Sequence, residues 1–164
     1  MIARMLFPVL LACSFAAAAT PVADYEPLAF LAGHCWKGTF PDGKQTDEHC
    51  FNWVYGDKFL RDVHTVRGAG HPDFHGESIY FWNSAAKQIE YLYIEDQGGF
   101  SRGVVGTATD ALVFPPTSYV EDGRTRTYRS RWQRAGENAY DVVTEFKSGD
   151  GWIDGFRIHL VKGG

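Results

Sequence analysis

Two cysteines lie at equal distances from a predicted turn, and this spacing constrains the fold more than any other feature of the sequence. Asp42-Gly43 is a common centre of a β-hairpin, and residues paired across one hairpin have numbers with a constant sum. For this turn the sum is 85, and 35 plus 50 is also 85. Facing cysteines on neighbouring strands can form a disulfide in an oxidising compartment. The spacing of Cys35 and Cys50 therefore predicts a hairpin, its register and a location outside the cytoplasm.

The first 19 residues have the features of an export signal. Arg4 supplies a positive charge, residues 5–13 are apolar, and alanines at 16–19 suit signal peptidase. The apolar run is too short to remain as a membrane span. We expect a signal peptide at 1–19, a single domain at 20–164, and a periplasmic or secreted location. Residues 10–13 also resemble a lipobox, and the alternative is an outer-membrane lipoprotein anchored through Cys13.

Composition limits the class of protein. About 145 residues remain after cleavage (164 minus 19), which is enough for one domain with a sizeable core. The net charge of −4 becomes −5 without Arg4, so there is no basic excess to displace phosphate counterions. We expect no nucleic-acid partner.

Short β-type runs separated by turn residues continue along the chain, which is typical of an all-β protein. The predicted strands are 33–40, 45–55, 58–68, 76–83, 88–96, 99–107, 110–114, 124–134, 138–147 and 152–162. Pro115-Pro116 is taken as the break that ends the seventh, and a short helical turn is expected at 24–31. Such short connections favour an antiparallel meander, and closure removes exposed edges. We predict an up-and-down barrel of about 8–10 strands, with a two-sheet sandwich as the alternative.

The first hairpin register separates two faces. Lys37 faces Glu48 and Thr39 faces Thr46, on the same solvated side as the two cysteines. The opposite side, which we expect to be the interior, carries His34, Trp36, Phe40, His49, Phe51 and Trp53.

A second turn extends this register to a third strand. Gly56-Asp57 fits a two-residue type II′ turn, so paired numbers sum to 113. His49 then meets His64, and Phe51 meets Asp62. The two turns together place Trp36, His49 and His64 in one row across the inner face, with Asp62 alongside.

Two histidines and a carboxylate inside a barrel are compatible with several kinds of chemistry. They could bind a metal ion, with His34 as the obvious third ligand, or form an acid–base pair. They could also form the polar end of a pocket, or pack as hydrogen-bonded core residues. The sequence has no nucleophile elbow, phosphate loop, H-E-x-x-H or dinucleotide motif. We therefore predict no catalytic residue, metal or cofactor.

Aromatic residues supply the remaining candidates. Tyr80, Trp82, Tyr91 and Tyr93 form a band in the fourth and fifth predicted strands, as core or as pocket wall. In the strand at 124–134, alternation turns Tyr128 and Trp132 inward and Arg129 and Arg131 outward.

The segment Leu31-Ala32-Gly33-His34-Cys35-Trp36-Lys37-Gly38 resembles the opening strand of calycin barrels. Lipocalins carry Gly-x-Trp there, and nitrobindin-like and related bacterial families carry Leu-x-Gly-x-Trp-x-Gly; this chain has one extra residue before the tryptophan. The resemblance implies a barrel of eight to ten strands with an internal cavity and a Trp closing its base. In nitrobindin-like proteins a histidine on a late strand ligates haem. His159 has a comparable position, but we do not transfer that role.

These features predict a barrel that holds a small apolar or amphipathic ligand in its interior. The expected binding residues are Trp36, His49, Phe51, Trp53, Asp62, His64, Tyr91 and Trp132. One alternative is a haem- or metal-binding protein or hydrolytic enzyme that uses His49, His64 and Asp62. The other is an envelope structural or partner-binding module with a filled interior.

Overall fold

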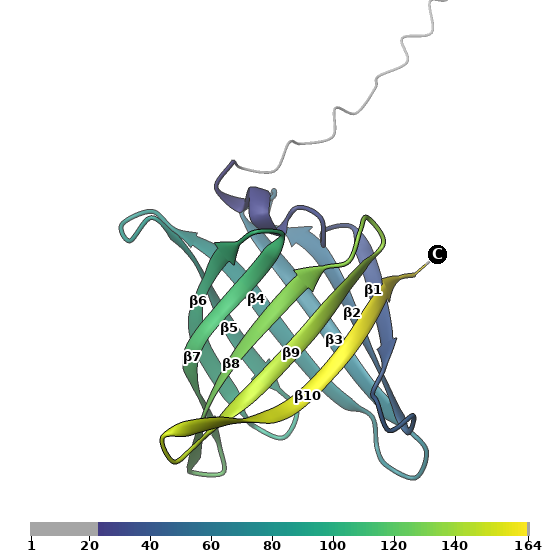
Figure 1. Ribbon diagram of the computed structural model, residues 1–164. Coiled ribbons are helices and arrows are strands. Elements are labelled where there is room, and N and C mark those ends of the chain that lie inside the picture. The colour runs from purple at the N-terminus through teal and green to yellow at the C-terminus, as the bar shows by residue number, and fades with distance from the viewer. Residues whose placement is uncertain (1–22, 164) are drawn as a thin grey trace, which may run out of the picture.

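Ten antiparallel strands form one closed barrel (Figure 1). The structure is a computed structural model that describes residues 23–163, so the predicted signal and Cys13 lie outside the described residues. The elements are η1 (Ala23–Leu28), a 3-10 turn, then β1 (His34–Thr39), β2 (Gln45–Val54), β3 (Phe59–Gly68), β4 (Phe74–Asn83), β5 (Gln88–Glu95), β6 (Phe100–Ala108), β7 (Ala111–Glu121), β8 (Arg124–Arg134), β9 (Ala139–Ser148) and β10 (Gly151–Lys162). Each strand pairs with its neighbours in sequence, and β10 pairs with β1. The predicted up-and-down barrel is confirmed, and it is consistent with a calycin-like fold.

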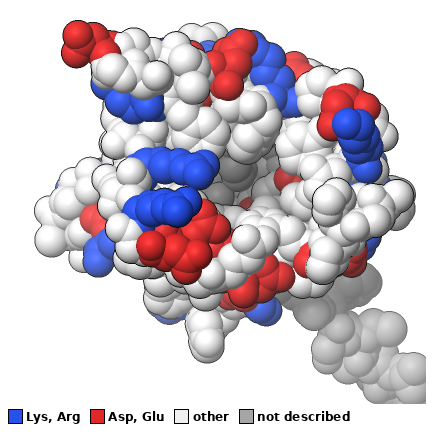
Figure 2. All heavy atoms as spheres, turned by 90° about the horizontal axis from the view of Figure 1, so that it is seen from below, with Lys and Arg blue, Asp and Glu red and all other residues white. Residues whose placement is uncertain are grey.

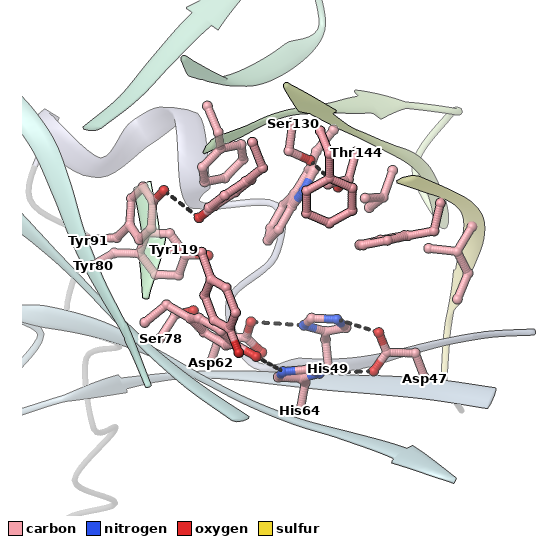
Figure 3. A pocket seen from close by; sticks show the side chains of 18 of the residues that line it. Asp47, His49, Asp62, His64, Ser78, Tyr80, Tyr91, Tyr119, Ser130 and Thr144 are labelled. Atoms are coloured by element: carbon pink, nitrogen blue, oxygen red, sulfur yellow. Dashed lines mark hydrogen bonds and ion pairs between the residues drawn. The ribbon is translucent and has the colours of Figure 1, made fainter. Parts of the chain in front are cut away.

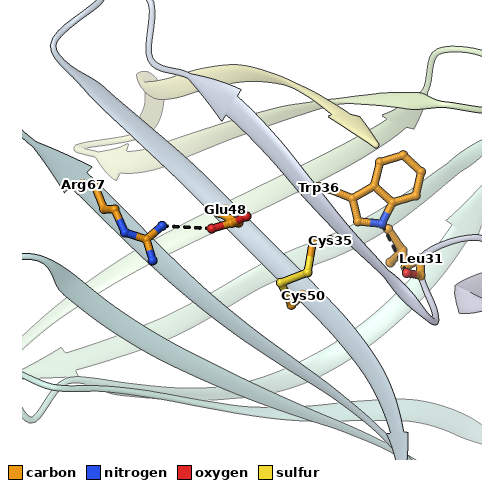
Figure 4. Close-up of a disulfide and its surroundings, with 6 residues drawn as sticks. All are labelled: Leu31, Cys35, Trp36, Glu48, Cys50 and Arg67. Carbon is orange, nitrogen blue, oxygen red and sulfur yellow. Dashed lines mark hydrogen bonds and ion pairs between the residues drawn. A yellow bond between two sulfur atoms is a disulfide. The ribbon is translucent and has the colours of Figure 1, made fainter. Parts of the chain in front are cut away.

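The first hairpin has the predicted register. Cys35 pairs with Cys50, Trp36 with His49 and Lys37 with Glu48, and the two cysteines form a disulfide with a Cα–Cα distance of 4.0 Å. Figure 4 shows this bridge on β1 and β2, with the Trp36 ring directed away from it. The bridge itself indicates an oxidising compartment. Among the residues that the structure describes, no helix is long and apolar enough to cross a membrane.

The second hairpin has the predicted register but a different turn. His49 pairs with His64 and Phe51 with Asp62, as the sum of 113 requires. Residues 55–58 form a four-residue connection in which Tyr55, Gly56 and Asp57 have φ values of 54°, 64° and 62°. A type II′ turn has a positive φ only at its first central residue, so that prediction was wrong. The register survives because the loop gains one residue on each side.

The predicted break at Pro115-Pro116 is also wrong. β7 continues through both prolines, and its pairing with β8 shifts between Phe114 and Thr117. A bulge leaves ladder positions unpaired, which suits residues without an N–H group. The prolines therefore bend a strand instead of ending it.

One end of the barrel is sealed by η1 and the segment after it (top of Figure 1). Tyr25, Leu28 and Leu31 are buried there, and the Tyr25 hydroxyl donates to the Lys58 carbonyl at 2.7 Å. Trp36 is fully buried beneath them, and its Nε1 donates to the Leu31 carbonyl at 3.2 Å (Figure 4). Packed side chains thus close this end, as the calycin resemblance implied.

Candidate functional site

The half of the barrel away from η1 contains a cavity of about 260 Å³. Figure 2 looks into this end of the molecule and shows a central hollow. Residues from β2 to β5 and from β7 to β10 line the cavity, and most of its surface is apolar or aromatic. The apolar and aromatic members include Tyr80, Tyr91, Phe114, Trp132, Val142, Phe146, Phe156 and Ile158.

A charged cluster forms one wall of the cavity, where β2 and β3 run side by side (Figure 3). His49 lies between two carboxylates: its Nδ1 is 2.8 Å from Asp62 Oδ2, and its Nε2 is 3.1 Å from Asp47 Oδ2. A carboxylate only accepts hydrogen bonds, so both ring nitrogens of His49 donate and the ring is an imidazolium.

The pKa values of this cluster follow from the same contacts. Burial alone lowers the pKa of His49, but the adjacent carboxylates of Asp62 and Asp47 outweigh it and raise the pKa to about 10. Burial alone raises the pKa of Asp47, and the charge and hydrogen bonds of His49, followed by those of His64, bring it well below its usual range. The two groups therefore hold each other in their charged forms.

His64 extends the cluster across β3. Its Nδ1 lies 3.1 Å from Asp47 Oδ1, and its Nε2 lies 3.1 Å from the Tyr93 hydroxyl. Burial, followed by the charges of neighbouring acidic groups, raises the pKa of Tyr93 far above its ordinary value, so Tyr93 keeps its proton. Tyr93 can thus donate to Nε2 while Nδ1 donates to Asp47, which satisfies a neutral His64 ring. The His49 and His64 rings are stacked, with centroids 4.7 Å apart.

Hydroxyl groups on other strands provide a second, uncharged polar region. The Tyr128 hydroxyl lies 2.8 Å from the Tyr91 hydroxyl and 2.8 Å from Ser101 Oγ. Burial is the main reason that the pKa of Tyr128 is far above its ordinary value, so this group stays neutral. Ser130 and Thr144 form a separate pair with their oxygens 2.9 Å apart. The cavity therefore has an ionic wall, neutral hydroxyl groups and aromatic surface in between.

Glu95, an acidic residue that is nevertheless buried, connects several groups at the open end of the cavity by hydrogen bonds. It accepts hydrogen bonds from the Tyr119 hydroxyl at 3.0 Å, from the Gln97 N–H at 2.6 Å and from the Gly99 N–H. These contacts fix Tyr119 at the cavity, next to Arg126, its partner in the β7–β8 register.

The predicted binding residues occupy two levels of the barrel. His49, Asp62, His64, Tyr91 and Trp132 line the cavity. Trp36 and Phe51 are fully buried but do not line it, and Trp53 packs against Tyr25 with ring centroids 5.4 Å apart. These three residues support the site from the sealed end.

Two histidines considered from the sequence lie elsewhere. His34 is exposed, so it is not the third ligand of a site with His49 and His64. His159 is also exposed, and its Nδ1 lies 2.7 Å from Asp141 Oδ1 on the outer face. The residue that does join the two inner histidines is Asp47. Its alternation with His49 was visible in the sequence, but it was not among the predicted site residues.

Asp47, His49 and His64 have the composition of a metal site, with potential ligand atoms all within 4.8 Å of one another. Imidazole lone pairs lie in the plane of the ring. The two rings are only 10° from parallel and are stacked, so one ion cannot lie in both planes unless a ring rotates. Each ring nitrogen also has a hydrogen-bond partner already. The arrangement therefore fits a proton-holding cluster better than a metal centre.

The cavity wall thus offers charge, hydrogen bonds and aromatic surface to a molecule inside it. Comparison of the chain with protein-family models and with curated proteins finds no match.

Proposed function

We propose that this protein binds a small amphipathic molecule inside its barrel. The observation that carries the proposal is the cavity of about 260 Å³, open at one end and sealed at the other, with a buried ionic cluster on an otherwise mainly aromatic and apolar wall. Ligand sites commonly combine apolar walls with a few fixed polar groups in this way. Pockets for drug-sized ligands measure roughly 300–1,000 Å³, so a small ligand is favoured here.

The hydrogen bonds of His49 leave this residue no role as a general base. A histidine that acts as a general base needs a free ring nitrogen to accept a proton. Both nitrogens of His49 donate to carboxylates, and these carboxylates raise its pKa to about 10 against the effect of burial. At neutral pH this ring is a fixed charge within the wall.

Two features of the chain support a location outside the cytoplasm. The Cys35–Cys50 bridge needs an oxidising environment, and the first 19 residues read as an export signal. We place the protein in the periplasm or outside the cell, where it would carry or store its ligand.

Filling the cavity tests the proposal. Val142 is buried and lines the cavity, whereas the next residue, Val143, points to the opposite face of β9. Val142→Phe should abolish binding of a neutral amphipathic probe, 2-phenylethanol, measured by ligand-observed NMR, and Val143→Phe should leave it unchanged. If the wild type binds no such probe and releases no small molecule in native mass spectrometry, the cavity is not a binding site.

A further inference from the structure

The ionic cluster carries more negative than positive charge. It contains two carboxylates, Asp47 and Asp62, and one imidazolium, His49, which leaves one negative charge in excess when His64 is neutral. All ion pairs that Asp47 and Asp62 form within the described residues are with histidines. A buried charge without a counter-charge is costly, so the wall is suited to receive a cation.

Asp62 also has an unused acceptor. The residue is 1% exposed, its Oδ2 is bonded to His49, and its Oδ1 has no hydrogen-bond partner among the residues that the structure describes. Buried acceptors are normally paired, and those that are not need an explanation. A water molecule would satisfy the oxygen but leave the excess charge in place. A positively charged N–H donor would satisfy the oxygen and also neutralise the excess charge.

The surrounding surface favours an organic cation. Tyr80, Tyr91 and Trp132 line the same cavity, and aromatic faces attract ammonium groups. A metal ion would need converging lone pairs, whereas the His49 and His64 rings are stacked at 10°. Arg126 lies at the open end but forms no ion pair with Asp47 or Asp62.

We propose that the ligand is a protonated organic amine whose ammonium group faces Asp62 and whose carbon skeleton packs against the aromatic wall. This inference rests on the proposed function, because it specifies the class of molecule that the cavity takes. It also excludes fatty-acid-like ligands, since their carboxylate would meet a wall of the same sign.

Three probes with one phenyl group and different head groups test the charge preference: 2-phenylethylamine, 2-phenylethanol and 3-phenylpropionate. With the wild-type protein at pH 7, calorimetry should show the amine binding at least tenfold more tightly than the alcohol, and the acid most weakly. Added salt should weaken binding of the amine and leave the alcohol unchanged.

The variant Asp62→Asn tests whether the preference for the amine comes from the ionic cluster. It should lower the affinity for the amine about tenfold more than it lowers that for the alcohol, and circular dichroism reports whether the variant is folded. Asp141→Asn, a change to a half-exposed aspartate paired with His159 on the outer face, should alter neither.

The outcomes separate the two proposals. Equal affinity for amine and alcohol would overturn the charge inference and leave the binding function intact. Tightest binding of the acid would overturn it in favour of Arg126 as the anchor, and stoichiometric binding of Zn²⁺ that displaces the amine would overturn it in favour of a metal site. Binding of none of the probes, together with no small molecule released in native mass spectrometry, would remove both proposals. The comparison of the three probes on the wild-type protein tests the charge preference even if Asp62→Asn does not fold.

Discussion

Three glycines around the cavity leave space that a side chain from a neighbouring strand occupies. A Cβ at Gly76 would overlap with Nε2 of His64 and lie 2.8 Å from the Tyr93 hydroxyl. In the same way, Gly103 leaves room for Tyr91, and Gly99 for Tyr119. The hydrogen-bonded hydroxyl groups of the site thus depend on the absence of specific Cβ atoms.

Gly76→Ala should therefore destabilise the protein and disturb the ionic cluster. His64 lies directly across from Gly76, and forcing its hydrogen-bonded ring aside costs about 1–3 kcal/mol, as for other overpacked sites. Urea unfolding measures the loss. Gly106→Ala is the matched control, because a Cβ there meets only the Val113 carbonyl at an ordinary 3.6 Å. Similar losses for both variants would mean that strand propensity, not space, determines the effect.

Much of the ionic wall was predictable from residue numbers. The sums of 85 and 113 that place His49 opposite Trp36 and His64 also place Asp47 opposite Gly38 and Val66, on the same inner face. The omission of Asp47 was thus an incomplete use of a correct register. The contact between His64 and Tyr93 is different, because it spans β3 to β5 and depends on a glycine between them.

At the scale of elements, hairpins with short symmetric loops were predictable and bulged strands were not. The four-residue turn at 55–58 keeps the register of a two-residue turn because it grows equally on both sides. Irregularities instead shift the register between Ser101 and Gly106, between Phe114 and Thr117, and between Asp154 and Phe156. Pro115 and Pro116 lie at the first two of these sites, so the prediction ended β7 too early by reading a bulged segment as a break.

The disulfide between β1 and β2 should stabilise this hairpin and with it the barrel. It closes a short loop, with a sequence separation of 15, for which loop entropy predicts about 3 kcal/mol. The double change Cys35→Ser with Cys50→Ser should lower the free energy of unfolding by roughly 2–4 kcal/mol. The control is Thr39→Ser with Thr46→Ser, another cross-strand pair on the same two strands. If oxidised and reduced protein melt at one temperature, the bridge does not contribute.

At the scale of the whole molecule, alternation predicts which way a side chain points but not how far along the barrel axis it lies. Trp36, Phe51 and Trp53 were correctly turned inward, yet they lie towards the sealed end, outside the cavity lining. That level depends on closure of the barrel, in which Trp36 pairs with Lys162 at the far end of the sequence. The shifts in β6, β7 and β10 accumulate before this closure, so hairpin rules alone cannot predict it.

The ionic wall should make the stability of the whole molecule depend on pH. The adjacent carboxylates raise the pKa of His49 to about 10, from 6.5 for an ordinary histidine. Protons therefore bind more tightly to the folded state, and the stabilisation is complete below pH 6.5 and lost as the pH rises through about 10. Between pH 6.5 and 9 we expect the free energy of unfolding to fall by up to about 1.4 kcal/mol per pH unit.

Urea unfolding of the wild type and of His49→Gln over pH 6.5–9 isolates this contribution. The variant has no proton to release at this position, so its stability should change less steeply, while other titrating groups affect both proteins alike. His159→Gln removes an exposed histidine paired with Asp141 and should retain the slope of the wild type. Parallel pH profiles for the wild type and His49→Gln would show that the ring is not held as an imidazolium. The excess negative charge of the ionic cluster would then be larger than inferred above, because His49 would carry no positive charge.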